Sequence, residues 1–281
     1  MEEKKAYKDA RQLQEEEIKK KLSKINHKLM VMSGKGGVGK SSIAAYLAIL
    51  LSKKGYKVGL MDIDLHGPSI PRLLGLKSGI IPSPTPGKAF PVKFSDNLEV
   101  ISIEALMGED KDIATIWRGP IKIGVIRQFI ADIEWSDPDF LIIDSPPGTG
   151  DEPLTVAQTI SDSRAIIVTT PQEISLADVR KSINFCEKVN MEILGIVENM
   201  SGLICPYCGK EINLFKKRGG EEIAKVRGLR FLGRIPIDPK VVESGDKGDV
   251  SFLDNKELDF TKAITEISNK VEDICVKKSL Y

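Results

Sequence analysis

Residues 34–41 read G-K-G-G-V-G-K-S and have the composition of a loop that surrounds phosphate groups. Glycines at four of these positions let successive backbone N–H groups point inward around phosphate oxygens. Lys40 can reach the terminal phosphates of a nucleotide, and the Ser41 hydroxyl can bind Mg²⁺. The residues that we expect to contact a nucleotide in this loop are Gly34, Lys35, Gly36, Gly37, Val38, Gly39, Lys40, Ser41 and Ser42.

A second lysine, Lys35, stands near the start of the same loop. Phosphate binding needs only one lysine, so the additional ammonium group suggests a further task. The alternative is an ordinary solvated lysine at the surface. Both interpretations remain open from the spacing alone.

Three aspartates follow strand-like runs and are candidates for metal and water chemistry. Asp144 closes the apolar run F-L-I-I, the Walker B position, where a carboxylate holds Mg²⁺ directly or through water. Asp62 and Asp64 end another apolar run; one can hold Mg²⁺-bound water while the other, preferably Asp64, orients the attacking water. The loop 145–151, S-P-P-G-T-G-D, has the stiffness expected of a segment that senses the γ-phosphate. For each aspartate the alternative is a turn or a helix cap.

The string C-P-Y-C-G places two thiols, Cys205 and Cys208, three positions apart. Two thiolates do not complete a tetrahedral zinc site, and a zinc ribbon needs a second pair of ligands. The other candidate ligands are single and scattered: Cys186, Cys275, His27 and His66. A redox dithiol would belong near the start of a thioredoxin-like domain, which the sequence does not encode. Two chains related by a two-fold axis would instead supply four thiolates, as a [4Fe–4S] cluster requires; a [2Fe–2S] cluster is also permitted.

The elements that must position these residues alternate between strands and helices. Strands are predicted at 29–32, 57–62, 98–103, 140–144, 165–170, 193–198 and 231–235, and helices at 42–54, 121–133, 176–189 and 219–226. The Pro- and Gly-rich stretch 78–94 is predicted to be an irregular loop. This alternation predicts an α/β fold: a doubly wound, mainly parallel sheet with helices on both faces. Ligands of such sheets bind beyond the carboxyl ends of the strands.

The chain divides into a charged extension at 1–26, helical or flexible, and a single domain at 27–281. The extension has apolar residues at near-helical spacing: Leu13, Ile18, Leu22 and Ile25. The domain carries the cysteine segment at 203–210 and a C-terminal helix within 258–281. That helix has a modest apolar face typical of packing, formed by Phe260, Ile264, Ile267 and Val271.

Composition excludes several classes of function. A formal net charge of +1 over 281 residues gives no argument for binding nucleic acid or an anionic membrane. The sequence contains no run of about 18 apolar residues, the length that a helix needs to span a bilayer. The charged N-terminal residues lack the apolar region of a secretory signal, and four cysteines are far from a disulfide framework. We therefore expect a cytoplasmic protein.

Three of these motifs together, the loop with Lys35, the run D-I-D-L-H-G-P-S at 62–69 and residues 144–151, resemble the deviant Walker A ATPases. Within that class they resemble the Mrp-type iron–sulfur cluster carriers, relatives of the nitrogenase iron protein and the septum-site ATPases. The similarity extends from about residue 29 to residue 239. It implies a P-loop NTPase fold, binding of ATP and Mg²⁺, and a homodimer in which Lys35 reaches phosphates on the partner subunit.

The resemblance also implies that Asn199, Pro236 and Asp238 frame the adenine, although a turn asparagine is the alternative for Asn199. Physically, an asparagine amide can pair with both N6 and N7 of adenine. In the carrier family the C-x-x-C pair bridges the dimer through the cluster.

The implied function is a slowly hydrolysing ATPase that assembles a labile [4Fe–4S] cluster between two subunits and transfers it to apo-proteins. Lys35, Lys40 and Asp64 would be catalytic, with Ser41, Asp62 and Asp144 on Mg²⁺. The alternatives are a positioning ATPase without metal and an ATPase with structural zinc. Cysteine is absent before Cys186, so a second, N-terminal cluster is not expected.

Overall fold

The computed structural model describes residues 12, 15–65, 67–77, 81–106, 119–204, 208, 210–212 and 219–276. Its centre is an eight-stranded sheet with the order β12-β9-β8-β1-β7-β2-β6-β5. The strands are β1 (His27–Met32), β2 (Val58–Asp62), β5 (Val92–Ser95), β6 (Leu98–Ser102), β7 (Phe140–Asp144), β8 (Arg164–Thr169), β9 (Ile193–Glu198) and β12 (Phe231–Arg234). Each neighbouring pair is parallel except β5 with β6. The predicted mainly parallel sheet is confirmed.

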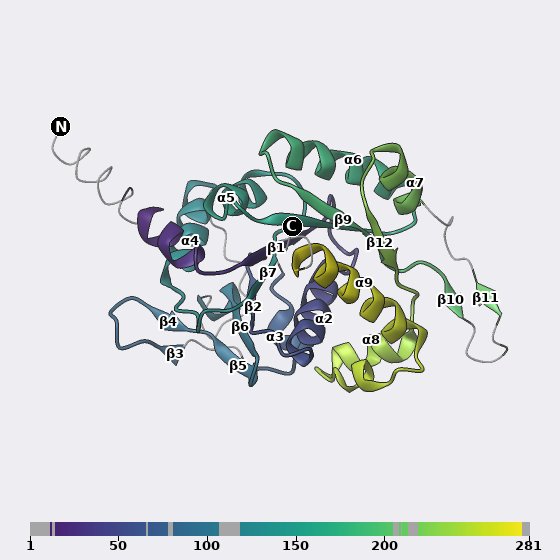
Figure 1. Cartoon of the computed structure of the whole chain (residues 1–281), viewed down its shortest axis with the longest axis horizontal. Helices are drawn as coiled ribbons and strands as arrows, with labels where there is room; N and C mark the ends of the chain where they lie inside the picture. The colour runs from purple at the N-terminus through teal and green to yellow at the C-terminus, as the bar shows by residue number, and fades with distance from the viewer. Residues whose placement is uncertain are drawn as a thin grey trace.

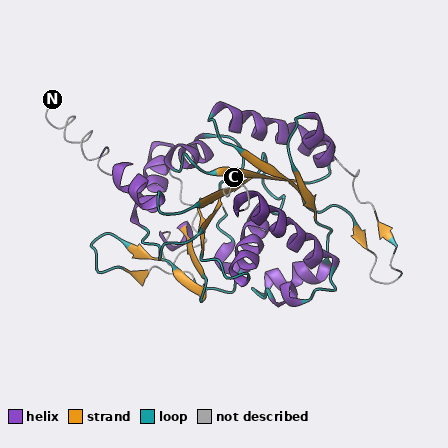
Figure 2. Cartoon of the chain, in the orientation of Figure 1, coloured by secondary structure: helices purple, strands orange, loops and turns teal. Residues whose placement is uncertain are grey.

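Helices cover both faces of this sheet, as Figures 1 and 2 show. One face carries α2 (Lys40–Lys53), α8 (Pro239–Asp246) and α9 (Asp259–Val276). The other carries α4 (Gly119–Asp132), α5 (Asp151–Thr159), α6 (Glu173–Lys188) and α7 (Gly219–Val226). The central strands β2 and β7 are buried along their whole length, which explains why their sequences are near-continuous apolar runs.

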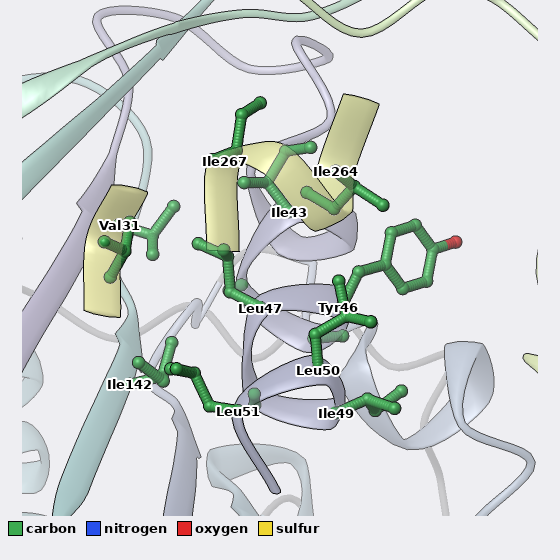
Figure 3. Close-up of a cluster of buried hydrophobic side chains, with 14 of the residues drawn as sticks. Val31, Ile43, Tyr46, Leu47, Ile49, Leu50, Leu51, Ile142, Ile264 and Ile267 are labelled. Carbon is green, nitrogen blue, oxygen red and sulfur yellow. The ribbon is translucent and has the colours of Figure 1, made fainter. Parts of the chain in front are cut away.

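The core beneath α2 and α9 fixes the helix that follows the phosphate loop. Figure 3 shows Ile43 and Leu47 of α2 lying close to Ile264 and Ile267 of α9, with Val31 of β1 beside them. All five are fully buried. The apolar face of α9 therefore packs against the core, as predicted. No helix among the described residues is long and apolar enough to cross a membrane.

Part of the N-terminal extension packs against the opposite face. Residues 15–22 are helical, and Ile18, Leu22 and Ile25 are buried in the same cluster as the apolar side chains of α4 and α5. The Lys21 ammonium donates to the Ala131 carbonyl at 3.1 Å. Leu13 lies outside the described residues.

The prediction of an irregular loop at 78–94 was wrong in part. β3 (Ile81–Pro82) and β4 (Ala89–Phe90) form a short antiparallel hairpin, and β5 adds an antiparallel edge strand to the main sheet. The prolines and glycine between β3 and β4 form its turn, and two-residue strands carry too little pattern to be recognised. Residues 78–80 lie outside the described part.

Several further elements were not predicted. They are the helices α3 (Ile70–Leu73), α5 and α8, two 3-10 helices, η1 (Ile103–Leu106) and η2 (Ser251–Asp254), and a second hairpin formed by β10 (Leu203–Ile204) and β11 (Glu211–Ile212). The hairpin projects from the edge of the molecule near β12 (Figure 1).

Candidate nucleotide and metal site

The glycine-rich loop lies between β1 and α2, as the sequence predicted. Gly37 and Gly39 have φ angles of 76° and 81°, in the left-handed region that glycine adopts without strain. Gly34 is required for a different reason, because a Cβ there would lie 2.3 Å from the carbonyl oxygen of Asp178 in α6. The loop therefore turns sharply between a strand and a helix, which leaves its N–H groups near the N-terminus of α2.

Three polar side chains lie in one row at the carboxyl ends of adjacent strands. In the register of the sheet, Asp62 of β2 is opposite Asp144 of β7 on one side and Ser102 of β6 on the other. Asp62 and Asp144 are fully buried, and Ser102 is nearly so. Because parallel strands in register point equivalent side chains the same way, the three share one face of the sheet. The structure thus brings the predicted aspartates together.

Lys40 crosses from α2 to these carboxylates. Its ammonium lies 2.5 Å from Asp144 Oδ1 and 3.6 Å from Asp64 Oδ2, and the side chain is only 6% exposed. With all three carboxyl groups ionised, Asp62, Asp64 and Asp144 carry three negative charges against the single charge of Lys40. Such an excess in a buried site favours a second cation or proton uptake.

The pKa values of Asp62 and Asp144 reflect this excess of negative charge and their burial. Burial raises the pKa of Asp62 above its ordinary value, and the neighbouring Asp144 carboxylate raises it further. Burial also raises the pKa of Asp144, although the Lys40 ammonium opposes that shift. A bound divalent cation would favour the ionised form of both groups.

The donor set fits Mg²⁺. Asp144 Oδ2 is buried and has no hydrogen-bond partner in the described part of the chain, so one carboxylate oxygen is available to a cation or its water. Asp62 differs, because its oxygens accept from Asp64 N at 3.1 Å, Ile70 N at 3.3 Å and Ser102 Oγ at 3.0 Å. Ser41 lies at the start of α2, and the Lys40 ammonium is 3.4 Å from its hydroxyl. Asp144 is therefore better placed to face the metal, and Asp62 is held in position by its donors.

A pocket of about 430 Å³ opens beside the phosphate loop, between α2, α3 and α8. It is lined by the predicted residues Asn199, Pro236 and Asp238 together with Gly39 and Ser42. Apolar side chains that the sequence did not single out complete its walls, including Tyr46, Val241 and Val242. An apolar cavity with a few polar groups, adjoining a phosphate loop, has the composition of a nucleoside site.

Asn199 and Asp238 also support the structure around this pocket. Asn199 Nδ2 donates to the Val38 carbonyl at 2.9 Å, so one of its two amide protons holds the phosphate loop. A Cβ at position 39 would lie 2.2 Å from that nitrogen and would displace the amide, and the φ of 81° also favours glycine there. Asp238 caps the N-terminus of α8 by accepting from Lys240 N at 2.9 Å.

Lys35 is partly buried and contacts its own chain. Its ammonium donates to Gln172 Oε1 at 3.2 Å, and Gln172 immediately precedes α6. This partner was not predicted, because 137 residues separate the two positions.

The loop 145–151 is bonded to the beginning of the phosphate loop. Gly148 N donates to the Ser33 carbonyl at 2.8 Å, and Gly148 has a φ of 87°. Ser145 Oγ donates to the Val31 carbonyl at 3.0 Å. These bonds place the Pro- and Gly-rich loop beside the candidate phosphate site.

The cysteine segment lies between β10 and β11. Cys208 is exposed, whereas Cys205 lies outside the described residues. Cys186 is buried with its sulfur 3.5 Å from that of Met32, as predicted for a core residue. Cys275 is also buried, and its sulfur accepts from Arg164 Nη2 at 3.0 Å.

Comparison with known proteins identifies the family. A profile described as NUBPL iron-transfer P-loop NTPase, of the ParA group, matches residues 24–272. An iron-sulfur cluster carrier protein of Methanocaldococcus jannaschii is 48% identical over 262 residues, covering 92% of this chain and 90% of that protein. A cytosolic Fe-S cluster assembly factor, CFD1, of Candida glabrata is 49% identical over 230 residues, covering 80% of each.

Solved structures with the same fold support this family assignment. A nucleotide-binding protein of Archaeoglobus fulgidus, in complex with ADP and with Co, has a TM-score of 0.73 and 41% identity, covering 84% of this chain and 92% of that one. The cell-division ATPase MinD of Pyrococcus furiosus, at 21% identity and a TM-score of 0.63, covers 89% of this chain and 100% of that one and shares the fold. The predicted resemblance is confirmed: the chain belongs to the family of NUBPL iron-transfer P-loop NTPases.

Proposed function

We propose that the protein is an ATP-binding iron–sulfur cluster carrier that holds a labile cluster between two identical subunits and delivers it to apo-proteins. One observation carries this proposal: a buried lysine–aspartate site adjoins a nucleoside-sized pocket, while an exposed thiol lies on a nearby hairpin. Relatives named as cluster carriers and assembly factors support it. Two relatives are described as cytosolic, which favours a cytoplasmic location.

The phosphate site supports slow hydrolysis of ATP. Backbone N–H groups of the glycine-rich loop and the ammonium of Lys40 would hold the phosphates, while Ser41 and Asp144 would hold Mg²⁺. Mg²⁺ bound there would supply charge neutralisation at the phosphate oxygens. Asp64, which shares Lys40 with Asp144, would orient the attacking water.

Symmetry supports the homodimer. Lys35 reaches Gln172 within its own chain, so its action on a partner's phosphates would require that contact to be exchanged. The cysteine pair supplies two thiolates where a cluster takes four ligands. Cys186 and Cys275 are buried and bonded elsewhere, to Met32 and Arg164, so neither adds a third ligand to the pair, and two thiolates alone do not complete a zinc site. A shared [4Fe–4S] cluster is thus favoured over zinc bound by one chain.

A short path within one chain favours coupling between nucleotide and cluster. Asn199 holds the phosphate loop and lies six residues before Cys205. Between them, Ile237 N donates to the Gly202 carbonyl at 2.8 Å, and Leu203 of β10 bridges to Ile237, which lines the pocket. A nucleotide that moves this wall of the pocket would therefore move the base of the cysteine hairpin.

Cluster transfer to an acceptor tests the proposal. The protein would be loaded anaerobically with iron and sulfide, mixed with an apo-ferredoxin, and followed by the visible spectrum of the acceptor. We expect transfer to be lost in Cys208→Ala and to respond to ATP in the parent protein but not in Lys40→Ala. Absence of iron uptake with tightly bound zinc would refute the carrier function.

A further inference from the structure

Ser102 occupies the third place in the row of polar side chains, beside Asp62 on the side away from Asp144. It is the last residue of β6 and is 4% exposed. Its hydroxyl donates to Asp62 Oδ2 at 3.0 Å. A buried hydroxyl bonded to a carboxylate is a charge-assisted contact, which is stronger than one between neutral groups.

The direction of this hydroxyl is set by the chain that follows it. Glu104 N donates to Ser102 Oγ at 3.2 Å, at the beginning of η1. Because that N–H points at the oxygen of Ser102, the hydroxyl proton is directed away from it and toward Asp62. The turn after β6 therefore orients the donor as well as burying it.

The Ser102 contact has a consequence for Asp64 through the other oxygen of Asp62. Asp62 Oδ2 accepts from Ser102 and from Ile70 N, the first residue of α3, while Oδ1 accepts from Asp64 N. With both oxygens held, the carboxylate of Asp62 cannot rotate freely, and the backbone of Asp64 is fixed relative to β2. The loop that carries the candidate water-orienting carboxylate is therefore anchored to β6 as well as to its own strand.

We infer that Ser102 is a positioning residue for the Mg²⁺–nucleotide site: it fixes Asp62, and through Asp62 it sets the backbone of Asp64. This inference rests on the proposed nucleotide function. Asp62 would act on Mg²⁺ through a metal-bound water, and removal of the hydrogen-bond partners of groups in a metal site commonly changes metal affinity by about 10- to 100-fold. Loss of the Ser102 hydroxyl should accordingly weaken the response to Mg²⁺ and leave Mg²⁺-independent nucleotide binding intact.

The test measures the binding of a fluorescent ADP analogue during a Mg²⁺ titration, in the full chain. Ser102→Ala should raise the Mg²⁺ concentration at half-effect by about tenfold or more, within the range seen for such partners. Its nucleotide affinity in EDTA should equal that of the parent. Ser102→Thr keeps the hydroxyl and should restore the parent midpoint. Ser52→Ala is the matched control, because Ser52 is a similarly buried serine whose hydroxyl donates to the Ile49 carbonyl within α2.

The outcomes separate this inference from the proposed function. A midpoint for Ser102→Ala within a factor of two of the parent would overturn the role of Ser102, even though the parent binds nucleotide with Mg²⁺. A parent protein that shows no Mg²⁺-dependent nucleotide binding would overturn the proposed function instead. If Ser102→Ala does not fold, Ser102→Cys replaces it, since a thiol of similar size is a weak donor and should shift the midpoint in the same direction.

Discussion

Two of the helices that line the pocket, α3 and α8, are each followed by a glycine, and these two glycines are in back-to-back contact. Gly75 follows α3 and Gly248 follows α8, with φ angles of 62° and 69°. A Cβ at position 248 would lie 2.5 Å from the Cα and 2.6 Å from the nitrogen of Gly75. Both neighbouring atoms belong to the backbone, so Gly248→Ala must separate the two loops.

The cost has two parts that a control variant can separate. An alanine in the left-handed region costs about 1–2 kcal/mol, and overpacking adds about 1–3 kcal/mol. Gly228→Ala supplies the first part alone, because Gly228 has a φ of 65° and a Cβ there would meet no atom of the described residues within 4 Å. Gly248→Ala should therefore lower the free energy of unfolding by about 1–3 kcal/mol more than Gly228→Ala.

Urea unfolding, followed by circular dichroism, measures this difference, and fluorescent ADP binding gives a second result. Since α3 and α8 both line the pocket, we expect Gly248→Ala to weaken nucleotide binding and Gly228→Ala to preserve it. Equal losses of stability in the two variants would refute the reasoning that backbone contact, beyond strain, requires glycine at 248.

Three further predictions concern single side chains. Asp144→Asn should reduce nucleotide affinity in Mg²⁺ to its value in EDTA, measured by the same fluorescence; a retained Mg²⁺ effect would argue against Asp144 as a metal group. Gln172→Leu removes the acceptor of Lys35 and should tighten the nucleotide-dependent dimer by about two- to tenfold, the value of one hydrogen bond, in sedimentation velocity; unchanged association would contradict this. Burial raises the pKa of Cys186 to about 12, so at pH 8 its thiol stays protonated. Iodoacetamide should then modify exposed Cys208 in the native protein and Cys186 only in urea, as peptide mass spectrometry would show; native labelling of Cys186 would contradict its burial.

The raised pKa of Cys186 also makes the free energy of unfolding depend on pH. The contribution of this thiol to the stability of the fold is fully present below the unfolded pKa of about 8.5. As pH rises from there toward 12, the unfolded state ionises first, and the folded state loses this part of its relative stability.

The features that depend on residues close together in the sequence were predictable from it. The order of strand, glycine-rich loop and helix around residues 34–41 is local, and left-handed turns there favour glycine. Asp62 and Asp144 could be placed because each ends an apolar run, and parallel strands bring their carboxyl ends to one edge. The packing role of α9 followed from its apolar stripe in the same way.

The rest depends on strand order and on contacts between distant segments. The sequence does not show that β6 lies next to β2, so Ser102 could not be paired with Asp62. The contact between Lys35 and Gln172 depends in the same way on where the start of α6 lies. Short elements such as α3 and β3 have too few residues for a periodic pattern, so tertiary packing decides them.

Native mass spectrometry of mixed subunits tests the central claim most directly. Parent chains would be mixed with a size-tagged Cys205→Ala, Cys208→Ala chain, exchanged, and reconstituted anaerobically with iron and sulfide. A shared site predicts one cluster of about four irons on the parent homodimer, and none on the mixed dimer or on single chains. A cluster or zinc ion retained by one parent chain, or by the mixed dimer, would contradict the account.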